Sequence, residues 1–214
     1  LLMEMQANFI LGSIFGGAYA DALGKSCEFL SKEDSRLYYK DGLSLDTIVQ
    51  DEHRIWWDKT DWTDDTDQAI LLMQSINESN SSEQCVKIFA DKMYNWLYNG
   101  FPELGDTGAV GVGRIVSWVV RHEKFRDDPF AASKDVWSYS SGISHEDGAI
   151  MRCAIAATFN KPKDDILNYT VSLCKTTHYD PRCVGGCIFV VSCVYDFIRG
   201  EKNIVNTMER AEYL

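Results

Sequence analysis

The sequence predicts an all-α fold, in one compact multi-helix domain that covers residues 1–214. Apolar residues recur along most of the chain at the three- and four-residue spacing of a helix, and no stretch shows the two-residue alternation of a half-buried strand. No internal repeat is visible, and 214 residues suffice for one domain with a well-buried core. We therefore expect helices packed on helices around a single core.

The first expected helix runs from about residue 1 to Gly24 and is rich in glycine and alanine. Several glycines within one helix are costly, so they usually indicate close approach by another backbone or a ligand. Asp21 and Glu28 lie at and just after the end of this helix, and each taken singly is typical of a solvated surface acid. Residues 31–61 show no clear period, which predicts a long ordered connection.

The clearest helix lies between Trp62 and Ile76, where Ala69, Leu72, Met73 and Ile76 share one face. The run Thr-Asp-Asp-Thr-Asp, residues 63–67, lies at or just before its first turn. One side-chain oxygen suffices to cap a helix, and carboxylates there favour the helix dipole. Five such side chains are more than a cap requires, and hard oxygens are the ligands of Mg²⁺ or Ca²⁺. Composition alone leaves both an acidic capped helix and a metal site open.

Four further helices follow from the same spacing, with apolar faces over residues 86–97, 114–120, 166–173 and 184–198. A glycine-rich loop at residues 100–113 precedes the second of them. No strand leads into this loop and its spacing is wrong for a dinucleotide-binding turn, so we exclude that function. Asp128-Pro129 is expected to interrupt the chain, and residues 138–142 to form a polar turn. The residues expected to be buried are Leu72, Met73, Phe89, Met93, Val191 and Val194.

Two polar segments of the second half are candidates for ligand binding. The stretch Ser-His-Glu-Asp-Gly-Ala-Ile-Met-Arg, residues 144–152, opens a helix, and N–H groups near Gly148 would form an anion cradle. Asp147 as a simple N-cap fits the same spacing equally well. The loop Thr-Thr-His-Tyr-Asp-Pro-Arg, residues 176–182, places Pro181 in the first turn of the next helix. His178 in that loop is either a ligand contact or a surface residue.

Composition excludes some partners and suggests a compartment. The formal net charge of −11 argues against a nucleic-acid surface, which needs clustered lysine and arginine. No apolar run is expected to reach bilayer length, and no secretory signal is visible, so no membrane partner is expected. The seven cysteines are scattered without a CxxC pair or a zinc spacing, which favours reduced core thiols in an intracellular, cytoplasmic protein. The chain lacks an initial Met and ends in a helix-like stretch, so we expect it to be cut at both ends and truncated at the C-terminus.

The order of four motifs resembles that of the ADP-ribosylglycohydrolases, which include dinitrogenase-reductase-activating glycohydrolases and ADP-ribosylarginine hydrolases. The motifs are Asp-Ala-Leu-Gly at 21–24 followed by Glu28, Trp-Thr-Asp-Asp-Thr-Asp at 62–67, Gly-Ala-x-Met-Arg at 148–152 and Thr-His-x-Asp-Pro-Arg at 177–182. The resemblance extends over residues 10–199, and the Asp-rich motif is its most specific part. It implies an all-α fold with two Mg²⁺ ions, or Mn²⁺ in some members, at the mouth of a cleft for ADP-ribose.

The resemblance also implies roles for individual residues. Thr63, Asp64 and Asp65 match metal ligands, and Glu28 matches an acid beside the metals, so that Glu28 or Asp65 would orient a water or take its proton. The residues that match the wrapping of diphosphate and ribose, together with one near the ligand, are Ser144, Gly148, Met151, Arg152 and His178. The substrate implied is an ADP-ribosylated protein or a small ADP-ribosyl adduct, and the Thr-His-x-Asp-Pro-Arg motif favours the arginine-linked form.

Two other functions stay open at this stage. The family's late Asp-x-Asp-Thr/Ser metal motif has no counterpart in residues 195–214, and Asp147 stands where Asn is usual. A truncated chain would explain the first of these departures. A non-catalytic member, which binds ADP-ribose or serves as a crystallin-like structural protein, would explain both. The weakest alternative is a plain helical interaction domain whose acidic residues are only helix caps.

Overall fold

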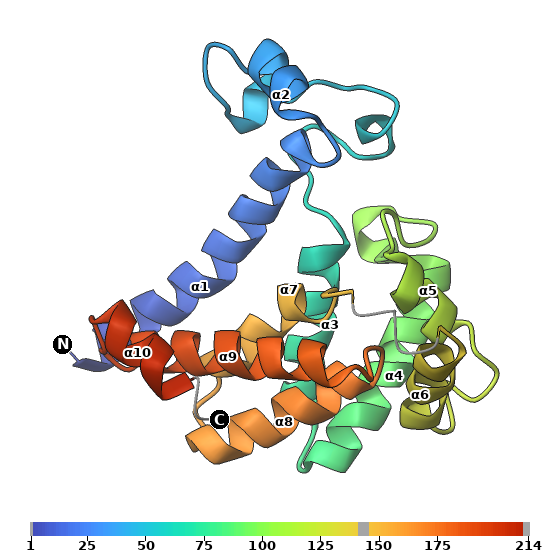
Figure 1. Ribbon diagram of the computed structural model, residues 1–214, viewed down its shortest axis with the longest axis vertical. Helices are drawn as coiled ribbons and strands as arrows, with labels where there is room; N and C mark the ends of the chain where they lie inside the picture. The colour runs from blue at the N-terminus through green and yellow to red at the C-terminus, as the bar shows by residue number, and fades with distance from the viewer. Residues whose placement is uncertain (1, 141–145, 212–214) are drawn as a thin grey trace.

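The computed structural model describes residues 2–140 and 146–211, and within them every regular element is a helix (Figure 1). The all-α prediction is therefore confirmed. The α-helices are α1 (Leu2–Gly24), α2 (Lys32–Tyr38), α3 (Asp64–Glu78), α4 (Ser82–Asn99), α5 (Arg114–Val120), α6 (Pro129–Tyr139), α7 (Ile150–Cys153), α8 (Lys163–Lys175), α9 (Pro181–Ile198) and α10 (Ile204–Ala211). The short 3₁₀ turns are η1 (Lys25–Cys27), η2 (Leu45–Thr47), η3 (Arg54–Trp56), η4 (Pro102–Leu104) and η5 (Ala154–Thr158).

The core forms where α3, α4, α7, α8 and α9 pack against one another, with η5 between α3 and α9. The predicted residues Leu72, Phe89, Met93 and Val191 are buried in it. Met73 and Val194 are only half-buried, so their prediction as fully buried residues is wrong. Both pack against the margin of the core, because an apolar stripe on a helix is wider than the part its neighbours cover.

The helix α6 corrects the expected interruption at Asp128-Pro129. The Asp128 carboxylate accepts a hydrogen bond from the N–H of Ala131 at 2.9 Å, and Pro129 occupies the first helical position. An aspartate cap followed by proline is a favourable helix start. The polar residues therefore begin a helix that extends through the start of the expected turn at residues 138–142; the end of that turn lies outside the described residues.

The segment between α1 and α3 is ordered, as predicted, although it also contains the helix α2. Arg54 holds this segment together from its interior. Its Nε donates to the carbonyl groups of Lys25 and Ser26 at 3.0 and 2.9 Å, and its other nitrogens bond the carbonyl of Glu28 and the carboxylate of Asp51. The end of α1 is thereby fixed relative to the chain that leads into α3.

The helix α9 contradicts the expectation that no stretch reaches bilayer length. It has 18 residues with a mean hydropathy of 1.5, which by length and composition suffice to cross a membrane, and 28% of it is buried. One such helix is weak evidence of a span, because core helices of soluble proteins share these properties. Here α9 packs against α8, α10 and η5. The absence of a membrane partner remains a prediction.

Candidate functional site

Asp21 organises the start of α3 from the end of α1. One of its carboxylate oxygens accepts bonds from the Thr63 N–H, the Thr66 N–H and the Thr66 hydroxyl at 2.9, 3.1 and 2.7 Å. The other oxygen accepts the Thr63 hydroxyl at 2.7 Å. Asp21 is half-buried, so the interpretation as a solvated surface acid is wrong. Its carboxylate ties the Asp-Ala-Leu-Gly motif to the Asp-rich motif.

Thr63 is the N-cap of α3, and Asp64 and Asp65 form the first turn. The Thr63 hydroxyl accepts the N–H of Asp65 at 3.3 Å while it donates to Asp21. This is the cap that the sequence predicts, although it uses a threonine oxygen and leaves the aspartate carboxylates for other contacts. The carboxylates of Asp64 and Asp65 therefore both lie at the N-terminal end of α3, the first buried and the second half-buried.

Asp64 is buried, and its carboxylate accepts a bond from the Gln68 amide at 2.9 Å. Burial, and then the charge of Asp65, raises the pKa of Asp64 to about 8. The glycine-rich loop supplies a further contact, because the N–H of Gly113 bonds the same carboxylate. This loop thus packs on the acidic N-terminal end of α3.

Gly111 shows why this loop needs glycine. Its φ of +76° lies in the left-handed region, and a Cβ atom there would lie 2.6 Å from the Trp57 ring and 3.7 Å from an oxygen of Asp64. A side chain would therefore push the loop away from the acidic helix end.

Asp65 is half-buried and is surrounded by other acids. Burial raises the pKa of Asp65 to about 6, and the charges of Asp21, Glu28 and Asp147 add to this effect. Together with Asp65, these acids come from three separate parts of the chain, at residues 21–28, 65 and 147. Their charges are therefore close enough in space to act on Asp65. We call Asp21, Glu28, Asp64, Asp65 and Asp147 the acidic group.

Asp67 completes the acidic run in a different way. Its two carboxylate oxygens accept bonds from the indole N–H groups of Trp62 and Trp96 at 2.8 and 2.9 Å. Burial raises the pKa of Asp67 to about 6, although these two hydrogen bonds act to lower it. Asp67 therefore anchors α3 to α4.

Glu28, the member of the acidic group that lies between α1 and α2, is exposed, and its charge acts on Asp65. Its carboxylate lies 3.0 Å from the Nε2 of His53, and its carbonyl is held by the buried Arg54. The next residue, Phe29, has a φ of +57° and an exposed ring that meets His53 edge-on. Arg54 and His53 were not identified from the sequence, because their segment has no periodicity.

Gly148 and His178 are brought together although 29 positions lie between them in the sequence. A Cβ atom on Gly148 would lie 3.2 Å from the Nε2 of His178, so any side chain there would require the ring to shift by a few tenths of an ångström. His178 is buried, and its Nδ1 lies 2.8 Å from the Thr177 hydroxyl. Its interpretation as a surface residue is therefore wrong. The expected helix after Gly148 is only the single turn α7, which continues as η5, so it supplies little of the expected dipole.

Arg152 is fully buried, whereas the family resemblance implies that it contacts the diphosphate. Its guanidinium donates to the Gln68 side chain and the Thr177 hydroxyl at 2.6 Å each, and to the Leu173 carbonyl at 3.3 Å. The arginine thus links α3, α7 and α8 from inside the protein. Met151 is half-buried on α7, and Ser144 lies outside the described residues.

The acidic group fits a hard divalent cation by its donor chemistry. Carboxylates that crowd a partly buried site and a nearby threonine hydroxyl are the oxygen donors that Mg²⁺ accepts. Within residues 2–140 and 146–211, no three carboxylates of this group bring their oxygens within 4.8 Å of one another. Metal binding would therefore require the side chains to rotate towards a common point.

Comparison with known proteins gives the chain a family. The model of the ADP-ribosylglycohydrolase family matches residues 4–213. An uncharacterized protein of Archaeoglobus fulgidus is 26% identical over 205 residues, which cover 93% of this chain and 60% of that protein. The chain thus spans less than two thirds of this relative's length. No solved structure matches the chain. Because the family model covers nearly the whole chain, the protein belongs to the ADP-ribosylglycohydrolase family.

Proposed function

We propose that the protein is a metal-dependent hydrolase that removes ADP-ribose from a modified protein side chain, arginine-linked by preference, or from a small ADP-ribosyl adduct. One observation carries this proposal: the four motifs, which are separate in sequence, meet around Asp65. Asp21 bonds the cap of α3, Glu28 and Asp147 act on Asp65, and Gly148 adjoins His178. Family membership supports an activity of the glycohydrolase type.

The metal is part of the proposal. Mg²⁺, as a pair of ions or with Mn²⁺ in its place, would be held by Thr63, Asp64 and Asp65. When bound it would polarise ribose hydroxyls and lower the pKa of a bound water. The buried Thr63 hydroxyl is held by the Asp21 carboxylate and by the N–H of Asp65, which orients this oxygen in advance.

The protein's own groups would carry the proton and position the substrate. Asp65, whose pKa of about 6 lies near neutrality, is suited to accept a proton from an attacking water. Glu28 is the second candidate base, because it is exposed and its backbone is fixed by Arg54. Gly148 and His178 would lie along the diphosphate. Arg152 would act as a positioning residue, since it bonds Thr177 beside His178. Water attack at the anomeric carbon then resembles other glycoside cleavage.

The test is release of ADP-ribose from arginine-linked and serine-linked ADP-ribosyl peptides by the purified protein with Mg²⁺. We expect turnover that EDTA removes, and a loss of kcat/KM of about 100-fold or more in Asp65→Asn, as for loss of a general base. Asp127→Asn, which changes an exposed aspartate in the connection between α5 and α6, is the matched control and should keep the rate. Full activity of Asp65→Asn would reject the proposal.

A non-catalytic member that binds ADP-ribose is the second candidate. The observation that favours it is Asp147, whose charge acts on Asp65 where a diphosphate would approach. This function predicts saturable ADP-ribose binding in calorimetry without release of ADP-ribose from either peptide. Replacement of the charge in Asp147→Asn should then tighten binding without creating turnover.

A further inference from the structure

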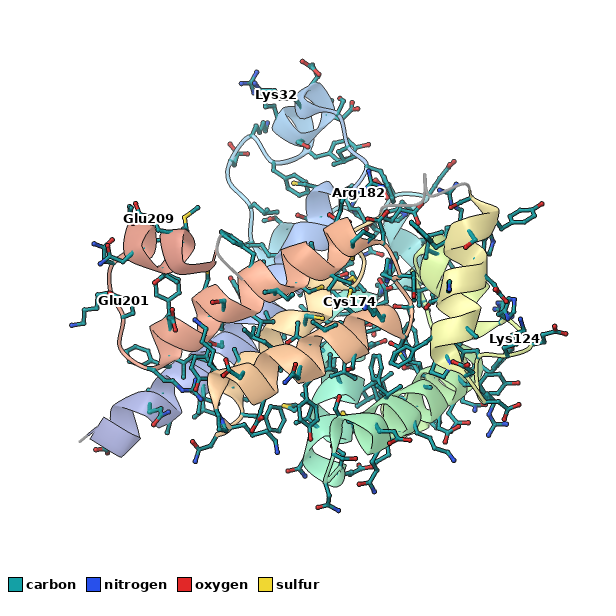
Figure 2. All side chains as sticks on the ribbon, turned by 60° about the horizontal axis from the view of Figure 1, so that its bottom comes forward. Lys32, Lys124, Cys174, Arg182, Glu201 and Glu209 are labelled. Carbon is teal, nitrogen blue, oxygen red and sulfur yellow. The ribbon has the colours of Figure 1, made fainter. Side chains whose placement is uncertain are left out.

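Four of the seven cysteines gather in the core, where α7, α8 and α9 pack against one another. We call Cys153, Cys174, Cys183 and Cys187 the cysteine cluster. They come from α7, α8 and α9, and all four are buried. Cys174 lies between α8 and α9 inside the helical body (Figure 2). The sequence spacing contains no metal motif, so the interpretation as scattered core thiols missed this convergence.

The geometry of the cluster matches that of a thiolate metal site. The sulfur atoms of Cys174, Cys183 and Cys187 all lie within 4.8 Å of one another, and that of Cys174 lies 3.9 Å from that of Cys183. Zinc bonds of about 2.3 Å in a tetrahedron separate two sulfur ligands by about 3.8 Å. In the described part of the chain this is the one set of three ligating side chains that converges so closely.

The secondary structure places these sulfurs with little freedom. Cys183 and Cys187 are four residues apart in the first turns of α9, so they share one face of a helix. Cys174 is on the last turn of α8, and the Cys153 thiol interacts with that of Cys187 from α7. At Gly186 a Cβ atom would lie 2.6 Å from the Ile150 side chain, which shows how closely α7 approaches α9.

A neighbouring buried cation gives independent support. The fully buried Arg152 bonds only neutral acceptors, it takes part in no ion pair of the described residues, and its Nε has no hydrogen-bond partner there. A buried charge without a counter-charge is costly. Arg152 precedes Cys153 and acts on its thiol electrostatically. Thiolates in the cysteine cluster would provide the missing negative charge.

We propose that Cys174, Cys183 and Cys187 bind one Zn²⁺ ion, with Cys153 as the fourth sulfur. Binding would release one proton per thiol, because thiolates are the ligands. Four thiolates around Zn²⁺ carry two net negative charges, of which the guanidinium of Arg152 balances one. The ion would fasten α7, α8 and α9 together behind the Gly148–His178 contact. Its role is structural, since the closed, buried site leaves no open position for a substrate.

The experiment measures metal directly in the intact protein. Protein expressed with added zinc and passed through a mild chelator should retain about one zinc per chain, by elemental analysis. Replacement of the ion by Co²⁺ should give thiolate-to-cobalt charge-transfer absorption and the strong visible bands of tetrahedral cobalt. An oxygen site such as the acidic group cannot give the thiolate bands, so the two sites are distinguished. This readout needs no variant and no enzymatic activity.

Variants locate the metal. The double variant Cys183→Ser/Cys187→Ser should retain about tenfold less zinc than the wild type, or even less, and should lack the thiolate bands. Cys85→Ser removes a thiol that is equally buried but lies outside the cluster, so it should retain both. Wild-type protein without zinc and without thiolate-cobalt bands would overturn the proposal. So would a disulfide between cluster cysteines in the freshly purified protein, found by intact mass after alkylation.

Discussion

The carboxylate of Asp21 offers the sharpest test of how the site is built. Four bonds from Thr63 and Thr66 end on it, two from backbone N–H groups and two from hydroxyls. Both threonines are buried, so these donors would be poorly solvated without Asp21. Asp21→Ala therefore removes the acceptor of the N–H and hydroxyl groups of both Thr63 and Thr66.

The expected loss can be estimated from these bonds. A hydrogen bond to a charged group contributes about 1.5–3 kcal/mol, and an unsatisfied buried donor costs about 1–3 kcal/mol. Bonds to one carboxylate are not additive, and water can reach part of this half-buried position. We therefore expect Asp21→Ala to lower the free energy of unfolding by about 3–4 kcal/mol. Asp21→Asn keeps one oxygen at the site of three bonds and should cost about 1 kcal/mol.

The assay is urea unfolding at pH 7, followed by circular dichroism. Asp128→Ala is the matched control, because it removes one cap bond from α6 away from the acidic group, at an expected cost of about 1 kcal/mol. If Asp21→Ala cost no more than Asp128→Ala, within about 0.5 kcal/mol, Asp21 would be only an ordinary cap and the reasoning would be refuted.

Three further predictions test other parts of the site. Gly111→Ala should lower the free energy of unfolding by about 2–4 kcal/mol through backbone strain and the clash with Trp57. The control Gly105→Ala has φ +97° but open space and should lose only about 1–2 kcal/mol in the same urea assay; equal losses would contradict the clash. Gly148→Leu should weaken ADP-ribose binding about tenfold or more in calorimetry, whereas the exposed Gly185→Leu should not; unchanged affinity would reject the placement of the diphosphate. Burial, and then the charge of Arg152, lowers the pKa of His178 to about 4, so His178 stabilises the fold fully above pH 6.5 and loses up to about 3 kcal/mol as the pH falls towards 4. Urea unfolding across this pH range should show that slope in the wild type and a smaller one in His178→Gln; identical slopes would exclude His178 as its source.

The sequence was sufficient to predict the helices that bury a periodic apolar stripe. The helix with Ala69, Leu72 and Ile76 on one face begins at Asp64, within the run of residues 63–67 where its first turn was predicted, because its cap and its stripe are both local signals. The start of α6 at Pro129 was missed because Asp-Pro indicates a turn as readily as a cap. The correct choice depends on whether Ala131 then finds the Asp128 carboxylate, which the structure shows.

The candidate site could be predicted only in part, since its members are local but its assembly is not. Thr63, Asp64 and Asp65 were identified as one run, Gly148 and His178 were candidates from their own segments, and the family resemblance added the roles of Glu28, Gly148 and His178 at one site. Neither source gives the bonds of Asp21, which join residues 42 and 45 positions apart. The role of Arg54 was also invisible, because a single arginine in an aperiodic segment carries no signal about the carbonyl groups it will meet.

The cysteines show the same limit of sequence-based prediction. Zinc motifs are recognised when two ligands lie close together on one loop, as in CxxC. Here Cys153, Cys174 and the pair Cys183/Cys187 lie on three helices, and each taken alone is an ordinary apolar core residue. Only the packing of α7 and α8 against α9 turns these positions into three sulfurs within 4.8 Å of one another. The zinc site that we propose would therefore arise from the way these helices pack. A rule based on sequence spacing cannot detect such a site.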